Sequence, residues 1–242
     1  MISVCIATYN GEAYIQEQLD SILTQLGEGD EIVVCDDQSS DRTLDIIDGY
    51  HDARIRTHRN EKRLGHVRNF EKALSLSKGD YVFLSDQDDI WLPGRVQIMM
   101  SKFEEDAAVD LVASNFDLID ASGVHLGEFR NLGEAKKSRF GQAFAIFAGR
   151  APYFGCTLLL RRSLLNNCLP IPSGVESHDI WIALIASLVG KVVNLPGPTL
   201  LHRVHGKNVT KKRRALVVIF RTRLLFLSAL VQRMFSLKFK TV

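Results

Sequence analysis

The sequence has little that would carry the chain into or across a membrane. It opens on a strand-like run at residues 2–7, without the basic and then apolar regions that are typical of a signal peptide. The hydrophobic stretch at residues 215–242 is interrupted by Arg221, Arg223 and Arg233, whereas a spanning helix needs about 20 apolar residues with few charges. We therefore expect a cytoplasmic protein that does not span a membrane.

Cysteine is scarce. The 4 cysteines among 242 residues show no C-x-x-C spacing, and Cys5 and Cys35 fall within predicted strands, so we expect reduced thiols in the core rather than disulfides. His202 and His205 form an H-x-x-H pair, but no third protein ligand is evident nearby, which argues against a zinc site. His205 alone is either a site residue or a structural histidine.

Two glycine-rich phosphate-binding motifs are missing as well. The G-x-G-x-x-G fingerprint is absent after the first strand, and the sequence holds no G-x-x-x-x-G-K-[ST] loop. These absences argue against hydride transfer and against P-loop chemistry. A formal net charge of +2 with 24% charged residues is ordinary for a globular protein, and we expect no nucleic acid as a partner.

Hydrophobic runs alternate with helical patterns in the first half of the chain. Strands are expected at residues 2–7, 31–35, 54–57, 81–84 and 110–115, and helices within residues 15–26, 70–76 and 93–104. Strand and helix in alternation predict an α/β fold with a doubly wound, mostly parallel sheet flanked by helices. Residues 123–141 are predicted to be a loop, residues 141–190 to be rich in helix, and residues 195–204 to be extended.

Carboxylates follow two of the predicted strands. Asp86, Asp88 and Asp89 come after residues 81–84, and Asp36 and Asp37 come after residues 31–35. In open α/β sheets, ligands bind at this edge. Clustered carboxylates repel one another unless a cation lies between them, which predicts a Mg²⁺ or Mn²⁺ site, with a solvated acidic turn as the alternative. The second pair either binds a nucleoside or caps a turn.

Four short motifs occur in one order along the first third of the chain: Ala-Thr-Tyr-Asn at residues 7–10, Asp-Asp-Gln-Ser-Ser-Asp at 36–41, Leu-Gly-His-Val-Arg-Asn at 64–69 and Ser-Asp-Gln-Asp-Asp at 85–89. Their order and spacing resemble glycosyltransferase family 2, whose members have the GT-A fold, over residues 1–210. The resemblance implies Mn²⁺ or Mg²⁺ on Asp88, with His205 as a further candidate contact. It also implies that the nucleotide-sugar is bound by Thr8, Tyr9, Asn10, Glu12, Asp36, Asp37, Arg68, Asp86 and Gln87.

The second half adds Glu-Ser-His-Asp-Ile-Trp at residues 176–181. In the family, an acid at the head of a helix serves as general base, and Asp179 matches that position, with Glu176 as the alternative. The usual residue before the acid is Glu, whereas this chain has His178. The His-Asp pair, Trp181, and Arg-Val-His-Gly-Lys-Asn at residues 203–208 resemble the rhamnosyltransferase-like branch of the family.

The resemblance implies a metal-dependent, inverting glycosyltransferase. Its donor is expected to be dTDP-rhamnose, with a UDP-sugar as the rival, and its acceptor a glycan or a lipid-linked glycan in surface polysaccharide synthesis. Residues 1–115 are expected to bind the donor, and residues 116–210 the acceptor. Residues 211–242 form a basic and apolar helical tail, which lies on the inner face of the cell membrane or packs on protein.

Two other functions are alternatives to a glycosyltransferase. A sugar-phosphate nucleotidyltransferase needs a glycine-rich loop after the first strand, and residues 8–11 are too poor in glycine for that role. A glycosyltransferase-like scaffold without activity would not require acids at every expected position, and this chain has them.

Overall fold

The computed structural model describes residues 1–129, 132–136, 138–206 and 216–238, and for residues 216–222 and 238 it describes the backbone alone. Residues 211–214, at the start of the predicted tail, and Lys207 and Asn208 of the Arg-Val-His-Gly-Lys-Asn segment lie outside these described residues. So does the side chain of Arg221.

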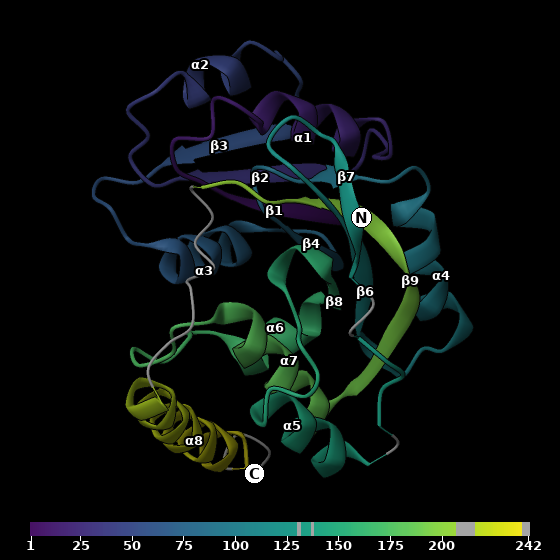
Figure 1. Cartoon of the computed structure of the whole chain (residues 1–242), viewed down its shortest axis with the longest axis vertical. Helices are drawn as coiled ribbons and strands as arrows, with labels where there is room; N and C mark the ends of the chain where they lie inside the picture. Colours follow the sequence, from purple (N-terminus) through teal and green to yellow (C-terminus); the bar gives the residue numbers. More distant parts are fainter. Residues whose placement is uncertain (130–131, 137, 207–215, 239–242) are drawn as a thin grey trace.

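A mixed sheet forms the centre of the molecule, with strands in the order β3-β2-β1-β4-β8-β6-β9-β5 and β7 paired to β6 (Figure 1). The strands β1, β2, β3 and β4 pair in parallel, whereas β8 runs antiparallel between β4 and β6. The predicted α/β fold is confirmed. The strands are β1 (Ile2–Thr8), β2 (Glu31–Asp36), β3 (Ile55–Arg59), β4 (Tyr81–Ser85), β5 (Ile90–Trp91), β6 (Val109–Ile119), β7 (His125–Phe129), β8 (Leu158–Arg161) and β9 (Lys191–Arg203).

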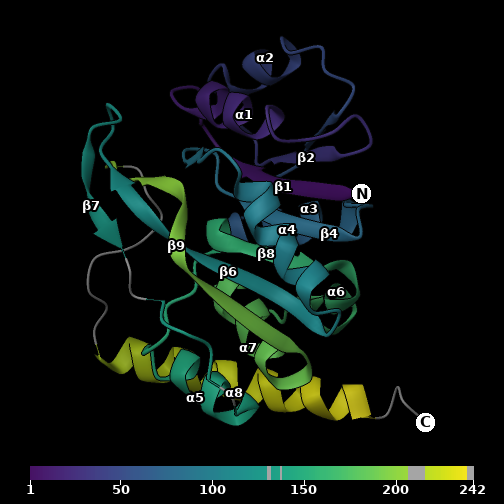
Figure 2. The same ribbon diagram turned by 90° about the vertical axis from the view of Figure 1, so that its right-hand side faces the viewer.

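Helices cover both faces of this sheet. The helices are α1 (Ile15–Leu23), α2 (Thr43–Asp48), α3 (His66–Leu76), α4 (Arg95–Glu105), α5 (Arg139–Phe147), the 3₁₀ turn η1 (Gly155–Thr157), α6 (Arg162–Cys168), α7 (His178–Val189) and α8 (Leu216–Lys238). One core lies under α1, α2 and α4, and a second lies under α3, α6 and α7. Helices α5 and α8 lie side by side outside α7, at the bottom of Figure 1 and of Figure 2.

The central strands are mostly apolar, and both of their faces are covered. In β1, Val4 and Ile6 belong to the core on the α1 side, whereas Cys5 belongs to the core on the α3 side. Successive side chains of a strand point to opposite faces, so a strand covered on both sides reads as a continuous hydrophobic run. All four cysteines are buried and free, which confirms that they are core thiols.

One expectation from the sequence is wrong in part. Residues 125–129 form β7, although residues 123–141 were predicted to be a loop. This strand is stabilised by its pairing with β6, where the rings of Phe116 and Phe129 stack with centroids 4.6 Å apart, and local sequence does not show that partner. Residues 141–190 are rich in helix, as predicted, and they also contain β8, which lies between β4 and β6. A run as short as Leu158–Arg161 fits helix and strand equally well.

Helix α8 packs on the domain through one of its faces. Phe226 and Ala229 are buried in the core beside α7. The Arg233 guanidinium donates hydrogen bonds to the carbonyl oxygens of Asn167 (3.2 Å) and Leu169 (2.8 Å) and lies 5.7 Å from the Trp181 ring. Among the helices that the structure describes, none is long and apolar enough to cross a bilayer.

Candidate functional site

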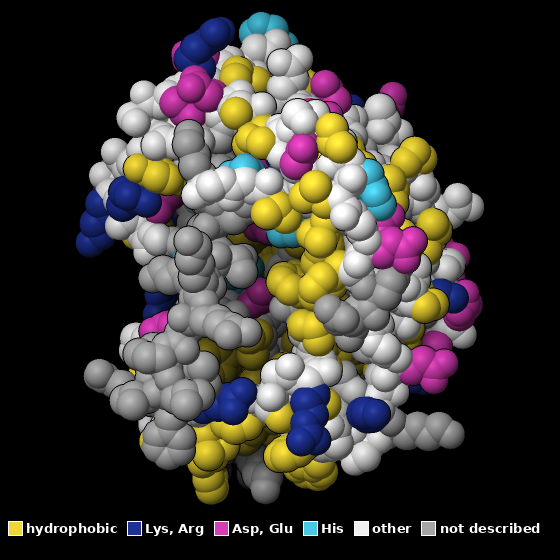
Figure 3. Space-filling model, viewed as in Figure 1, with side chains coloured by type: hydrophobic (Ala, Val, Ile, Leu, Met, Phe, Trp, Pro, Cys, Tyr) yellow, Lys and Arg dark blue, Asp and Glu magenta, His cyan; other side chains and the backbone are white. Residues whose placement is uncertain are grey.

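The carboxyl ends of three parallel strands meet at one edge of the sheet. Thr8 at the end of β1 pairs with Asp36 at the end of β2, and Ile6 pairs with Ser85 at the end of β4. The loops that follow surround a pocket of about 680 Å³. Figure 3 shows a hollow in this face of the molecule, with acidic and histidine side chains inside it. The pocket is lined by Thr8, Tyr9, Asn10, Asp37, Asp86, Gln87, Asp88 and His205, all of them predicted site residues.

Asp36 is the last residue of β2 and Asp37 is the first residue after it, but the two have different surroundings. Asp36 is fully buried, and its carboxylate accepts hydrogen bonds from Thr8 Oγ1 (3.1 Å) and from the Ser39 backbone N–H (2.9 Å). Asp37 lines the pocket and accepts hydrogen bonds from the backbone N–H groups of Leu64 (2.7 Å) and Gly65 (2.9 Å). Asp36 therefore holds the loop behind the pocket, whereas Asp37 faces the pocket and fixes the entry to α3.

Gln87 connects the loop after β4 to the loop after β1. Its side-chain Oε1 accepts a hydrogen bond from the Tyr9 N–H (2.9 Å), and its Nε2 donates one to the Tyr9 carbonyl oxygen (3.1 Å). A Cβ atom at Gly11 would lie only 2.5 Å from Gln87 Oε1, so this contact requires glycine at position 11. The Gln87 side chain therefore joins the two loops by pairing with both backbone polar groups of Tyr9.

Tyr9 presents an aromatic face at the mouth of the pocket. The Arg63 guanidinium carbon lies 3.7 Å from the centroid of its ring. A ring of this kind can stack on a planar nucleobase, and the adjacent arginine adds positive charge where a phosphate would bind.

The side chains of three other predicted nucleotide-binding residues are bonded to other parts of the protein. Asn10 has a φ of +50°, and its Oδ1 accepts a hydrogen bond from the Ser40 backbone N–H (2.9 Å). Glu12 accepts one from the Arg42 N–H (3.1 Å). Arg68 pairs with Glu71 and donates a hydrogen bond to the Ile171 carbonyl oxygen (2.6 Å). Of these three residues, Asn10 lines the pocket, and Glu12 and Arg68 are not among its described lining residues.

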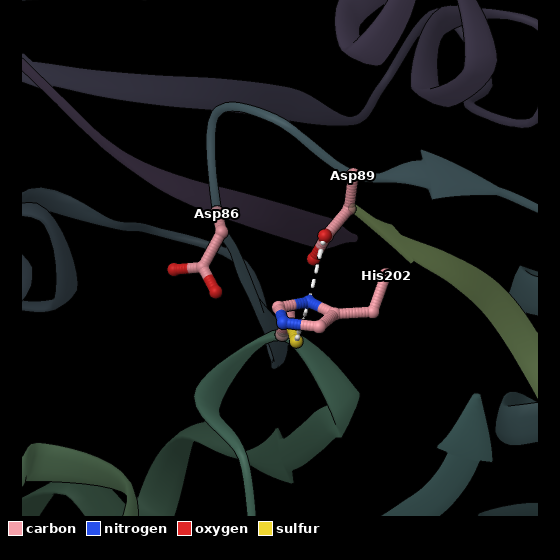
Figure 4. A group of neighbouring side chains, drawn as sticks. Asp86, Asp89 and His202 are labelled. Atoms are coloured by element: carbon pink, nitrogen blue, oxygen red, sulfur yellow. Dashed lines mark hydrogen bonds and ion pairs between the residues drawn. The ribbon is translucent and has the colours of Figure 1, made fainter. Parts of the chain in front are cut away.

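The acidic segment after β4 meets two histidines from the end of β9 and the loop beyond it. Asp88 Oδ2 lies 2.7 Å from His205 Nε2, and Asp89 Oδ1 lies 2.8 Å from His202 Nδ1. Figure 4 shows Asp89 and His202 pointing at one another, with Asp86 across from them. The Arg203 backbone N–H also donates to Asp89 Oδ1 (3.1 Å), so Asp89 joins this segment to β9.

Burial and the charges of neighbouring carboxylates disfavour ionisation of Asp86 and Asp88. Burial, followed by the charges of Asp89 and Asp88, raises the pKa of Asp86 to about 8. Burial also raises the pKa of Asp88, and the charge of Asp89 adds to this effect. Burial alone would lower the pKa of His202, but the charge and hydrogen bond of Asp89, together with the charges of Asp86 and Asp88, raise this pKa to about 9. A cation bound among these carboxylates would offset their mutual repulsion and lower their pKa values.

The donor atoms of this cluster fit a hard divalent ion. Asp88 and His205 present a carboxylate oxygen and an imidazole nitrogen side by side at the pocket wall. Asp89 Oδ2 is buried and has no hydrogen-bond partner among the described residues. Carboxylate oxygen with imidazole nitrogen suits Mn²⁺ or Mg²⁺ better than a thiol-rich set would. The residues therefore fit the predicted ion.

A thiol near His202 was missed by sequence reasoning. Cys156 Sγ lies 3.9 Å from His202 Nδ1, and the ligand atoms of Asp86, Asp89, Cys156 and His202 lie within 4.8 Å of one another. Ligand atoms thus lie near His202 of the H-x-x-H pair in space, although none was evident nearby in the sequence. Burial, followed by the charges of Asp89 and Asp86, raises the pKa of Cys156 well above its ordinary value, so the thiol stays protonated.

Asp179 lies in the first turn of α7, near the acidic cluster. Its Oδ1 accepts hydrogen bonds from the Ser177 hydroxyl and from the Ile180 N–H (2.7 Å), and its charge contributes to the raised pKa of Asp86. Asp179 is half-buried and is not among the described lining residues of the pocket.

His178, beside Asp179, is a buried neutral ring. It stacks on Phe70 with centroids 4.2 Å apart, and burial lowers its pKa to about 4. Neither ring nitrogen has a hydrogen-bond partner among the described residues, and a Cβ atom at Gly155 would lie 2.7 Å from Nε2. His178 therefore occupies a tight space that a longer, charged Glu would not fill in the same way.

Several pocket residues were not found from the sequence. Within residues 64–69 the resemblance points to Arg68, whereas the structure places His66 and Asn69 at the pocket. Asn69 Nδ2 also donates a hydrogen bond to the Cys35 carbonyl oxygen (2.7 Å). Residues four apart on a helix share a face, so the spacing of His66 and Phe70, which also lines the pocket, was the available signal.

Comparison with known proteins points to one family. The model of the family described as Glycosyl transferase family 2 matches residues 3–169. The UDP-Glc:alpha-D-GlcNAc-diphosphoundecaprenol beta-1,3-glucosyltransferase WfaP of Escherichia coli is 27% identical over 213 residues, which cover 88% of this chain and 81% of that protein. An uncharacterized glycosyltransferase of Methanocaldococcus jannaschii is 29% identical over 193 residues, which cover 77% of this chain and 65% of that protein.

The fold has counterparts among solved structures. The crystal structure of Staphylococcus aureus TarS 1–349 in complex with UDP-GlcNAc superposes with a TM-score of 0.76 at 20% identity, over 94% of this chain and 66% of that one. The match confirms the GT-A-type fold. The chain thus spans about two thirds of the length of TarS 1–349 and of the Methanocaldococcus relative.

Proposed function

The chain belongs to glycosyltransferase family 2, and we propose that it transfers a sugar, with inversion, from a nucleoside-diphosphate sugar to a glycan or lipid-linked glycan in surface polysaccharide synthesis. One observation carries the proposal. A single pocket combines an aromatic ring with an arginine over it, at Tyr9 and Arg63, and the acid–histidine pair of Asp88 and His205. Residues 1–115 form the donor half of this site, and residues 116–210 form the acceptor half.

The donor binds along the loops after β1, β2 and β4. Tyr9 stacks on the nucleobase. The Asp37 carboxylate accepts hydrogen bonds from the base or the ribose at the acceptor positions that its backbone contacts leave free. Thr8, Asn10, Glu12 and Arg68 belong to the same proposed binding surface, and Asp36 acts from behind by holding Thr8. Glu12 and Arg68 would have to leave their present partners to reach the donor.

The diphosphate lies toward Asp86, Asp88 and His205. A bound Mn²⁺ or Mg²⁺, held by Asp88 and His205, would supply Lewis-acid stabilisation of the negative charge that develops on the departing diphosphate. Asp86 becomes a carboxylate when a cation compensates its neighbours, since its raised pKa depends on burial and on their charges. Arg63, which lines the same pocket, adds positive charge.

Asp179 is the proposed general base. An acceptor hydroxyl is a weak nucleophile at neutral pH, so a carboxylate must take its proton as the new bond forms. The Ser177 hydroxyl and the Ile180 N–H hold one carboxylate oxygen of Asp179, which leaves the other oxygen to accept that proton. Attack from the face opposite the diphosphate inverts the anomeric carbon.

The donor is proposed to be a pyrimidine nucleotide-sugar. The His178–Asp179 pair with Trp181 favours dTDP-rhamnose. The relative WfaP, named for its use of UDP-Glc, and the TarS complex with UDP-GlcNAc favour a UDP-sugar. The diphosphoundecaprenol acceptor in the name of WfaP supports a lipid-linked acceptor, and hence action at the cytoplasmic face of a membrane.

Calorimetric titration tests the proposal. The protein is titrated with UDP, dTDP and GDP, each with and without Mn²⁺, and the titrations are repeated with Asp88→Asn. We expect one pyrimidine diphosphate to bind with Mn²⁺ and to lose at least about tenfold in affinity in the variant. If no diphosphate binds under any condition, the chain is an inactive scaffold and the proposal fails.

A further inference from the structure

Helices α5 and α8 expose an unusual amount of hydrophobic surface. Most of the exposed large hydrophobic side chains among the described residues lie on these two helices. Phe140 and Phe144 of α5 are 80% and 63% exposed, and Phe235 of α8 is 60% exposed. Isolated exposed hydrophobic residues are common, but contiguous patches mark binding surfaces.

These side chains form one continuous surface. A groove of about 720 Å³ runs between α5, α7 and α8, and its walls include Phe140, Phe144, Leu227, Val231 and Phe235. We call these five residues the α5–α8 surface. Phe140 and Phe144 lie four residues apart and so project from the same side of α5. The surface therefore has two aromatic side chains that do not belong to the tail.

The charged side chains on the two helices of this surface are of one sign. The sequences of α5 and α8 contain no Asp or Glu. Arg139 and Arg223 are exposed, and Arg223 Nη2 lies near Gly149, just beyond the end of α5. Figure 3 shows hydrophobic side chains together with Lys and Arg along the lower edge of the molecule, where these helices lie. Apolar surface edged with arginine is complementary to anionic lipid headgroups above acyl chains.

The same charges argue against a second copy of the chain as the occupant. A two-fold contact brings the same patch of both copies together. Arginine would then face arginine, with no acid on α5 or α8 to pair with it.

We propose that the α5–α8 surface docks the protein on an anionic lipid bilayer, with Phe140 and Phe144 of α5 entering the interface together with α8. The inference deepens the proposed function, which has a lipid-linked acceptor. Helix α7 carries Asp179 in its first turn and Leu184 and Leu188 in the groove wall. At 1.5 Å per residue, those leucines lie about 7–14 Å along the helix from Asp179. Docking here brings the general base close to the headgroup region.

Vesicle binding by the full chain tests the docking. The probe is flotation with vesicles of phosphatidylglycerol and phosphatidylethanolamine in equal amounts, without donor or metal. Phe140→Ser with Phe144→Ser should weaken binding about tenfold or more. The matched control, Val124→Ser with Leu126→Ser, removes two hydrophobic side chains outside α5 and α8 that are 60% and 56% exposed, and it should bind as the unchanged chain does. Undiminished binding by the α5 variant overturns the proposal.

A second variant reports insertion directly. Trp91 and Trp181 are buried, so a tryptophan placed at Phe144 dominates any response to lipid. Phe144→Trp should show a blue shift of emission on adding the anionic vesicles and little on adding phosphatidylcholine vesicles, and Val124→Trp should show none. An absent shift at position 144, or a dimer that dissociates in the α5 variant, overturns the proposal. Sugar transfer enters neither measurement, so failure of the proposed function would be seen separately, in the nucleotide titration.

Discussion

The pocket and the α5–α8 surface are unusual in opposite ways: the pocket buries acidic side chains, whereas the surface exposes hydrophobic ones. In the pocket, acids are buried and hold one another back from ionisation, as in the raised pKa of Asp86. On the α5–α8 surface, phenylalanine is exposed, as at Phe140. Each arrangement costs stability unless something from outside the chain compensates it, a cation in the first case and an apolar phase in the second. Unrelieved local costs of this kind are good guides to function.

The largest expected effect is a loss of turnover that leaves the α5–α8 surface unaffected. Asp179→Asn keeps the shape of the side chain but removes its ability to take a proton, so kcat should fall about 10³-fold. The affinity for the nucleoside diphosphate should stay within about twofold, and vesicle binding should not change. Steady-state kinetics and titration measure both. Glu176→Gln is the matched control, and a greater loss of turnover there than in Asp179→Asn would transfer the role of general base to Glu176.

The second effect concerns stability of the pocket against pH. His202 has a pKa of about 9 in the folded protein and an ordinary value of 6.5, so its charged form stabilises the fold below about pH 6.5. That contribution is lost as the pH rises through about 9. Asp86, with a pKa raised to about 8, acts in the same direction, since its protonated form is the one that the fold favours.

We therefore expect the melting temperature in chelator to fall by roughly 5–10 °C between pH 6.5 and pH 9, or about 2–3 kcal/mol. His202→Gln should flatten this dependence. A melting temperature that rises over the same interval would contradict the assigned protonation states.

The smallest effect concerns the attachment of α8. Arg233→Met keeps most of the hydrophobic length but removes the hydrogen bonds to the carbonyls of Asn167 and Leu169. We expect a loss of about 1–2 kcal/mol in the free energy of unfolding, measured by urea denaturation. Arg223→Met, an exposed arginine on the same helix, should stay within about 0.5 kcal/mol. Equal effects in the two variants would mean that Arg233 does not anchor the helix.

The two regions also differ in how far sequence alone predicted them. The pocket acids follow apolar runs, and the carboxyl ends of parallel strands must meet at one edge, so the approach of Asp37, Asp86 and Asp88 was foreseeable. The contact of Gln87 with Tyr9 and the hold of Glu71 on Arg68 depend on how loops close in space, which no local pattern encodes.

For the α5–α8 surface, the sequence analysis predicted only the contribution of the tail and not that of α5. Phe140 and Phe144 have helical spacing, but so do residues of a buried helix, and periodicity alone does not tell which face remains uncovered. Helix α7 is apolar on all sides because the sheet lies on one side and α5 and α8 lie on the other.

On the proposed function, the pairing of Gln87 with the backbone of Tyr9 would make two binding events reciprocal. One loop would offer the ring for a nucleobase and the other the acids for a cation, so ordering of either loop by its ligand would lower the entropy that the other still has to lose. By thermodynamic linkage, each ligand must then tighten the other by the same factor. The absence of a side chain at Gly11 makes room for Gln87 and thereby permits this cooperativity.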